Sequence, residues 1–117
     1  MFRFQKLDVY NRSILLSTQL IKIASNFNFR YKRISDQLIG AVISIALNIA
    51  EGQGRINSKE RIQFYRISIA SAFELIAILD ICEKLDLINK NKWEKEITEI
   101  CKMMNGLIKS QKSIPKN

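Results

Sequence analysis

Apolar residues recur at steps of three and four along most of this chain, the spacing that places side chains on one face of an α-helix. The alternation of apolar and polar residues that is typical of a half-buried β-strand does not occur. The pattern predicts four helices, at about residues 4–27, 35–52, 58–86 and 91–110. Because their connections are short, we expect an all-α, up-and-down antiparallel four-helix bundle, with residues 1–117 forming one domain.

Three of the predicted helix starts carry polar residues that can accept hydrogen bonds from free backbone amides. Ser35 is expected to cap the second helix. Asn57 and Asn91 are expected to cap the third and fourth helices. Each is followed three positions later by a glutamate, Glu60 or Glu94, as in a capping box.

The second predicted helix has a wide apolar surface made of two seams. Between the seams runs a stripe of small and polar residues: Gln37, Ala41, Ser44, Asn48 and Glu51. Gly52 and Gly54 suit the C-terminal end of this helix. Because a single four-helix bundle would bury such a surface only in part, we expect the protein to self-associate.

Asn48 and Glu51 allow two interpretations. They are either a catalytic or metal-binding pair, or hydrogen-bonded groups that fix the register of the helices. The second is favoured because buried polar groups are normally paired. Glu74 has apolar neighbours in the third helix, which predicts a buried carboxylate, and such a group needs a partner such as Arg55 or Arg66.

The composition narrows the possible functions. Lysine and arginine outnumber aspartate and glutamate by 19 to 11, which gives a net charge of +8 and favours a polyanionic partner. The chain has no histidine, and Cys82 and Cys101 lack metal-ligand spacing, so we expect free thiols and neither a metal nor a cofactor. The N-terminus does not resemble a signal peptide, and no uninterrupted apolar run reaches the roughly 18 residues of a membrane span. A cytoplasmic location is expected.

Two basic clusters are candidate nucleic-acid contacts. The first is the segment FNFRYKR, predicted to be a loop, in which Phe27, Phe29 and Tyr31 alternate with the cations Arg30, Lys32 and Arg33. The second spans the turn into the third helix: Arg55, Lys59, Arg61 and Arg66. Cations in either cluster could contact phosphates, and the rings of the first could stack on unpaired bases. Alternatively, the aromatic rings close the bundle end, the charges only maintain solubility, and Arg55 is tied to Glu51 or Glu74.

The segment SIALNIAEGQGR, followed by SKERIQFYRISIASAFEL, resembles the 23S rRNA intervening sequence protein family of four-helix bundles. The resemblance rests on a motif that includes Asn48, Glu51, Gly52, Gly54 and Glu74. The start of the chain, with Phe4, Leu7, Val9, Tyr10 and Ser13, fits as well. The chain departs from the family pattern at a few positions: Ile39 and Gly40, often two arginines; Ala46, often proline; and Ser71 and Ala72, often Gly-Ser.

The resemblance implies a cytoplasmic homopentamer, often encoded within intervening sequences of large-subunit ribosomal RNA genes. A related group acts as accessory proteins of retroelement reverse transcriptases. We therefore expect a non-enzymatic, oligomeric bundle that binds RNA or another nucleic acid through its basic surface. The alternative is an adaptor that docks a protein such as a reverse transcriptase. A metal-dependent nuclease using Glu51, Glu74 and Asp80 is the weakest hypothesis, because no phosphate loop or metal-ligand spacing accompanies these carboxylates.

Overall fold

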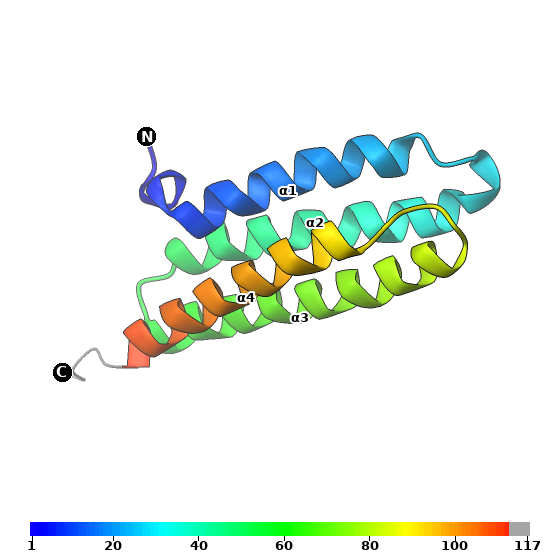
Figure 1. Ribbon diagram of the computed structural model, residues 1–117. Coiled ribbons are helices and arrows are strands. Elements are labelled where there is room, and N and C mark those ends of the chain that lie inside the picture. Colours follow the sequence, from blue (N-terminus) through cyan, green and yellow to red (C-terminus); the bar gives the residue numbers. More distant parts are fainter. Residues whose placement is uncertain (113–117) are drawn as a thin grey trace.

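The computed structural model describes residues 1–112, which form four long helices joined by short connections (Figure 1). Their bounds are α1 Asp8–Ser25, α2 Lys32–Gln53, α3 Ser58–Lys84 and α4 Asn91–Lys112. Two short 3₁₀ helices, η1 (Arg3–Lys6) and η2 (Phe29–Tyr31), precede α1 and α2. No strand occurs in these residues, so the predicted all-α antiparallel bundle is confirmed. Residues 113–117 of the predicted domain lie outside the described part.

The first two helices begin at different residues from those predicted. α1 starts at Asp8 and not near residue 4, because Arg3–Lys6 form a 3₁₀ turn. α2 starts at Lys32, so the prediction that Ser35 caps it was wrong. Ser35 is instead buried inside α2, and its hydroxyl donates to the backbone carbonyl of Ala24 at 2.8 Å. A residue suited to capping was therefore used to join α2 to the end of α1.

The prediction that Asn57 caps α3 is confirmed, and the prediction that Asn91 caps α4 was wrong. The Asn57 side chain accepts hydrogen bonds from the first amides of α3, at 2.8 and 3.3 Å. Asn91 is already the first residue of α4, and its own amide donates to the Asn89 side chain at 3.2 Å. α3 ends at Lys84, two residues before the predicted end, because Asp86 has a left-handed backbone (φ 59°) that cannot continue the helix.

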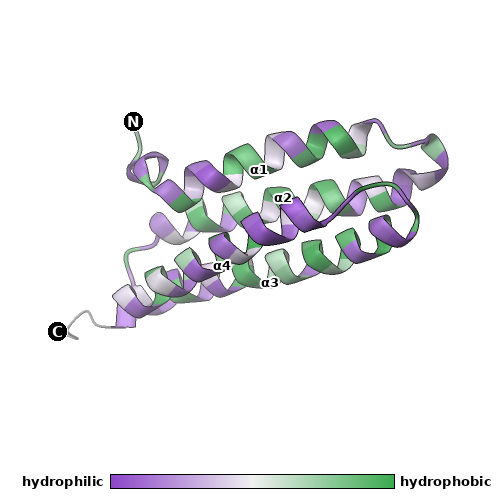
Figure 2. Ribbon diagram, viewed as in Figure 1, coloured by the Kyte–Doolittle hydropathy of each residue, from purple (hydrophilic) through white to green (hydrophobic). Residues whose placement is uncertain are grey.

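The core lies along the bundle axis, and all four helices contribute to it. Hydrophobic and hydrophilic residues alternate around each helix, as Figure 2 shows. The largest fully buried side chains of the core are Leu16, Leu20, Leu38, Val42, Ile45, Ile49, Tyr65, Leu75, Leu79, Ile97, Ile100 and Met104. Four of them, Leu38, Val42, Ile45 and Ile49, follow α2 at steps of three and four, which is the periodicity on which the fold prediction rests.

Serine hydroxyls allow close contacts between helix backbones. Ser17 of α1 donates to a carbonyl of α2 at 3.2 Å, and Ser68 of α3 donates to another α2 carbonyl at 2.9 Å. Both serines are buried. A larger side chain at either position would hold the two helices apart, so these residues help to set the packing of α2 against both of its neighbours.

The two outer helices, α1 and α4, make the least extensive helix pair of the bundle. Arg12 and Glu96 join them through two hydrogen bonds, Nε to Oε1 at 2.9 Å and Nη2 to Oε2 at 3.0 Å. The hydrogen bond to Glu96 raises the pKa of the Arg12 guanidinium further. This paired, planar geometry is the strong form of an arginine–carboxylate contact.

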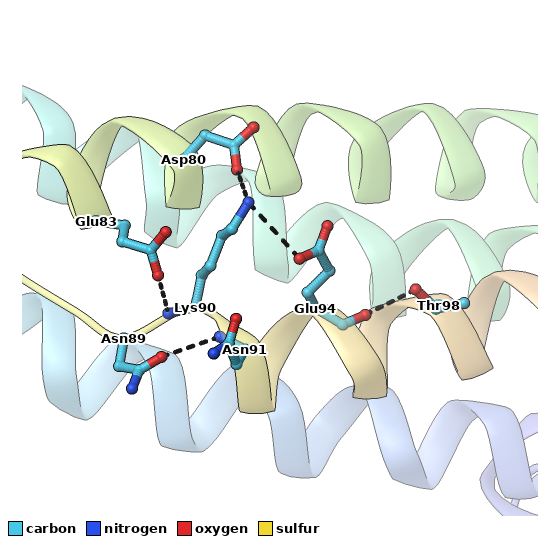
Figure 3. A network of polar contacts seen from close by, with 7 residues as sticks. All are labelled: Asp80, Glu83, Asn89, Lys90, Asn91, Glu94 and Thr98. Carbon is cyan, nitrogen blue, oxygen red and sulfur yellow. Dashed lines mark hydrogen bonds and ion pairs between the residues drawn. The ribbon is translucent and has the colours of Figure 1, made fainter.

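Lys90 organises the connection between α3 and α4, as Figure 3 shows. Its ammonium lies 2.6 Å from a carboxylate oxygen of Asp80 and 3.7 Å from one of Glu94. Its backbone amide also donates to Glu83 at 3.2 Å. The hydrogen bond with Asp80 raises the pKa of Lys90. One lysine thus links the end of α3 to the start of α4.

Two helical segments, Phe29–Gln53 and Ser58–Lys84, are long and apolar enough to cross a membrane by length and composition alone. The core helix of a soluble protein meets the same criterion. Here both segments place many of their apolar residues in the bundle core. Their hydropathy is therefore weak evidence for a membrane protein.

Candidate nucleic-acid interface

The first predicted basic cluster lies at the turn between α1 and α2. The Asn28 side chain accepts a hydrogen bond from the amide of Arg30 at 3.0 Å and starts the 3₁₀ turn η2. Lys32 and Arg33 then form the first turn of α2, so the prediction of a loop was wrong for these two residues. Lys32 pairs with Asp36 at 2.8 Å, which leaves Arg30 and Arg33 as exposed cations without an ion pair among residues 1–112.

The aromatic residues of this cluster have different environments. Phe29 is 81% exposed, whereas Phe27 is half-buried and packs against the core. Tyr31 is also half-buried. Phe27 thus closes the bundle end, as the alternative interpretation predicted, while Phe29 is free to contact a ligand.

The second cluster surrounds the turn between α2 and α3, which is built around Gly52. A Cβ atom at Gly52 would lie 2.6 Å from Cε1 of Tyr65, so only glycine fits against this buried ring. The ring is held in turn by Gln53, whose side-chain nitrogen donates to the Tyr65 hydroxyl at 2.6 Å. Gly54 ends α2 with an ordinary backbone (φ −80°). The two glycines of the motif therefore shape the turn and are not a phosphate-binding loop.

Two arginines of the second cluster are engaged within this turn. Arg55 pairs with Glu51 at 3.1 Å, and its guanidinium lies 4.7 Å from the centre of the Phe64 ring. Arg61 donates from Nε to the carbonyl of Arg55 at 2.6 Å. The expected tie between Arg55 and Glu51 is confirmed. These contacts are exposed at their edges, so the arginines stabilise the turn and still add positive charge to this end of the bundle.

Lys59 and Arg66 of the second cluster lie on the outer side of α3, where the C-terminal end of α4 approaches. Lys112 lines the same surface groove as Lys59 and Arg66. Nearby, Arg61 Nη1 lies 3.4 Å from the side-chain oxygen of Gln111. The sequence reasoning missed Lys112 as a site residue, because only the antiparallel packing of α4 on α3 brings it to this groove.

The two basic clusters lie at opposite ends of the bundle. α2 separates them, and its 22 residues correspond to about 33 Å. The α2–α3 turn shares its end with η1 and with the C-terminal end of α4 (Figure 1). These segments add further basic residues there: Arg3, Lys6, Lys109 and Lys112. The structure therefore does not join the two clusters into one site, and it enlarges the second.

The prediction that hydrogen-bonded polar groups of α2 fix the helix register is confirmed for Asn48 and is wrong for Glu51. Half-buried Asn48 donates to the Ser44 carbonyl at 2.8 Å and to the Ser44 hydroxyl at 3.0 Å. That hydroxyl lies 2.7 Å from the Ser71 hydroxyl, so the network joins α2 to α3. The Glu51 side chain is 57% exposed. Glu74 is exposed too, which contradicts the predicted buried carboxylate and its arginine partner.

The carboxylates of the nuclease hypothesis do not form a site. Because Ser44 faces Ser71 across antiparallel helices, Glu51 lies about 15 Å along the bundle from Glu74 and about 24 Å from Asp80. Asp80 is paired with a lysine. Within residues 1–112, no group of three cysteine, aspartate or glutamate side chains is placed to hold a metal ion. The absence of enzymatic activity remains a prediction.

The comparison with known families agrees with this architecture. Residues 5–106 match the 23S rRNA-intervening sequence proteins. The chain belongs to this family. The match includes every residue that the sequence assigned to the two basic clusters and every residue of the Asn48–Ser44–Ser71 network, but not Lys112. No curated protein matches the chain.

A solved structure shows the same fold. It is a protein of unknown function from the S23 ribosomal protein family of Bacteroides thetaiotaomicron, with 21% sequence identity and a TM-score of 0.78. The alignment covers 86% of this chain and 95% of that one. At this identity the likeness concerns the fold alone.

Proposed function

We propose that this family member is a non-enzymatic, oligomeric bundle of the cytoplasm that binds RNA through its basic surface. The observation that carries the proposal is the concentration of cations at the α2–α3 end. There, Lys59, Arg66 and Lys112 come together from two helices, and none has an ion pair within residues 1–112. Free cations around one groove suit phosphates, the part of RNA that supplies most of the affinity in such contacts.

The family name supports RNA as the polyanion, because it refers to the intervening sequences of 23S ribosomal RNA. The chain has no histidine, and no phosphate loop or metal cluster accompanies the basic residues within residues 1–112. Binding through phosphates and shape, with little reading of bases, is the chemistry that such a surface offers.

Exposed apolar side chains support self-association. Leu47 on α2 is 58% exposed and Ile81 on α3 is 53% exposed. Covering them in an assembly removes apolar surface from water. A homopentamer, the assembly implied by the family resemblance, would also repeat the basic groove around a ring. Repetition turns several weak phosphate contacts into tight binding.

Light scattering after size exclusion tests both parts of the proposal, with and without a structured RNA at about 50 and 300 mM salt. We expect a particle several times the 13.6 kDa chain mass that takes up RNA at the lower salt only. The triple variant K59A/R66A/K112A should lose RNA, whereas K22A/K84A/K95A, which removes three exposed lysines elsewhere, should retain it. The variant R30A/K32A/R33A measures the contribution of the opposite end.

The exposed apolar residues also favour a second function, an adaptor that docks a protein such as a reverse transcriptase. In that case the particle would ignore RNA at both salt concentrations. A monomer at all concentrations would refute the assembly, and equal RNA binding by K59A/R66A/K112A and K22A/K84A/K95A would refute the groove as the contact.

A further inference from the structure

An exposed aromatic residue continues the basic groove along the bundle. Phe73 is 70% exposed on α3, although it lies in the middle of the longest helix of the described chain. Lys59, Arg66 and Phe73 are spaced by seven residues, so they follow one face of α3 at intervals of about 10 Å. The groove lined by Lys59, Arg66 and Lys112 extends to Ala70, one turn before Phe73.

Phe73 also lines a second groove, which lies between α3 and α4. Its walls include the cation Lys102 and the polar side chains of Thr98 and Asn105 from α4. Apolar residues such as Ile76 line it as well. We call the surface formed by Lys59, Arg66, Phe73, Lys102 and Lys112 the α3–α4 track.

The charge along the α3–α4 track is not neutralised by its neighbours. Lys102, like the other three cations, has no ion pair within residues 1–112. Glu99 of α4 lies one turn after Glu96, which bonds Arg12, so it is on the side of α4 toward α1. Glu74 lies three residues after Ser71, on the side of α3 that faces α2. Glu60, the residue after Lys59, lies about 100° from it around α3, so Glu60, Glu74 and Glu99 flank the track and do not interrupt it.

We propose that the α3–α4 track holds an unpaired RNA strand, with phosphates on Lys59, Arg66, Lys102 and Lys112 and a base stacked on Phe73. A row of cations beside an exposed ring is the combination that binds single strands, because each base has a face that can stack. A duplex keeps its bases stacked inside, so it would use the cations alone. This inference rests on the proposed RNA binding and specifies the form of RNA that this surface prefers.

Two substitutions at Phe73 separate stacking from apolar burial. Phe73→Leu keeps an apolar side chain and removes the ring, whereas Phe73→Tyr keeps the ring. Both should fold, because the residue is largely exposed. We expect Phe73→Leu to weaken binding of a labelled single strand of about 12 nucleotides by roughly tenfold, and Phe73→Tyr by less than about twofold. Duplex RNA of the same length should bind both variants like the wild type.

The triple variant K59A/R66A/K112A provides the electrostatic test. It should weaken single-stranded and duplex RNA together, and it should reduce the slope of log K against log salt for the single strand by about 2. Fluorescence anisotropy gives these values, and light scattering of each variant reports its assembly.

Each outcome bears on the track separately from the proposed function. If the wild type binds RNA and Phe73→Leu binds the single strand equally well, the track is wrong and RNA binding stands. If Phe73→Leu lowers the particle mass, the ring contacts a second copy of the chain, and the track is wrong for that reason. If the wild type binds no RNA at low salt, the proposed function fails and the track fails with it.

Discussion

Two glycines of α2 provide a sharp test of how this bundle is packed. A Cβ atom at Gly52 would meet Cε1 of Tyr65 at 2.6 Å, Cδ1 at 3.0 Å and the Arg61 carbonyl oxygen at 3.3 Å. Tyr65 is fully buried and its hydroxyl is bonded to Gln53, so the ring cannot move aside freely. At Gly40, in the same helix, no atom lies within 4 Å of the added Cβ.

The two alanine substitutions should therefore change stability in opposite directions. Replacing glycine by alanine inside a helix gains up to about 1 kcal/mol, because alanine loses less backbone entropy on folding. Gly40→Ala should raise the free energy of unfolding by about 0.5 to 1 kcal/mol. At Gly52 the same gain is opposed by overpacking, which costs about 1 to 3 kcal/mol, so Gly52→Ala should lower the free energy of unfolding by up to about 2 kcal/mol.

Urea denaturation followed by circular dichroism measures both values at one protein concentration. The double variant Gly52→Ala/Tyr65→Leu supplies the control for mechanism. With the ring removed, alanine at position 52 should no longer destabilise relative to Tyr65→Leu alone. Equal stabilisation by Gly40→Ala and Gly52→Ala would refute the steric argument, because it would mean that the contact between Gly52 and Tyr65 is not tight.

Three further predictions concern the polar contacts and the thiols. Arg12→Met should lower the free energy of unfolding by about 0.5 to 1 kcal/mol at low salt. A double-mutant cycle with Glu96→Gln should show that the coupling free energy between Arg12 and Glu96 is smaller at high salt. The pKa of Lys90 is raised by its bond to a carboxylate, so its contribution is present below the unfolded pKa of about 10.5 and is lost as pH rises through the folded pKa. Lys90→Met should thus lower the melting temperature at pH 7. The difference in melting temperature from the wild type should disappear once the pH exceeds the folded pKa of Lys90. Burial raises the pKa of both thiols. A disulfide reagent at about pH 8 should therefore modify half-buried Cys101 slowly and Cys82 only on unfolding. Fast reaction of Cys82 would contradict its burial.

The helices could be predicted from periodicity because apolar seams depend only on local spacing. The same reasoning failed for Glu74, since Phe73 and other apolar neighbours suggested burial. Of these neighbours Leu75 is buried, whereas Phe73 is 70% and Ile67 is 42% exposed. An apolar stretch shows that a helix has apolar surface to bury, but it does not show against which face a neighbouring helix packs.

Helix ends were predicted where one side chain could decide them. Asn57 caps α3 because its oxygen reaches the first free amides within the same turn. Ser35 had the right chemistry for a cap, but an upstream 3₁₀ turn started α2 earlier, and the carbonyl of Ala24 offered its hydroxyl a partner from another helix. Competition between a local and a long-range hydrogen bond cannot be judged from spacing.

The sequence by itself determined the number and type of the helices, the positive charge and the residues of the family motif, because each depends on residues close together in the chain. Tertiary structure decided which cations meet. It placed the clusters around Arg30 and Arg66 at opposite ends of the bundle and brought Lys112 to the latter. The physical reason is that antiparallel packing joins the start of α3 to the end of α4, and a charge acts on a ligand through distance in space and not through distance along the chain.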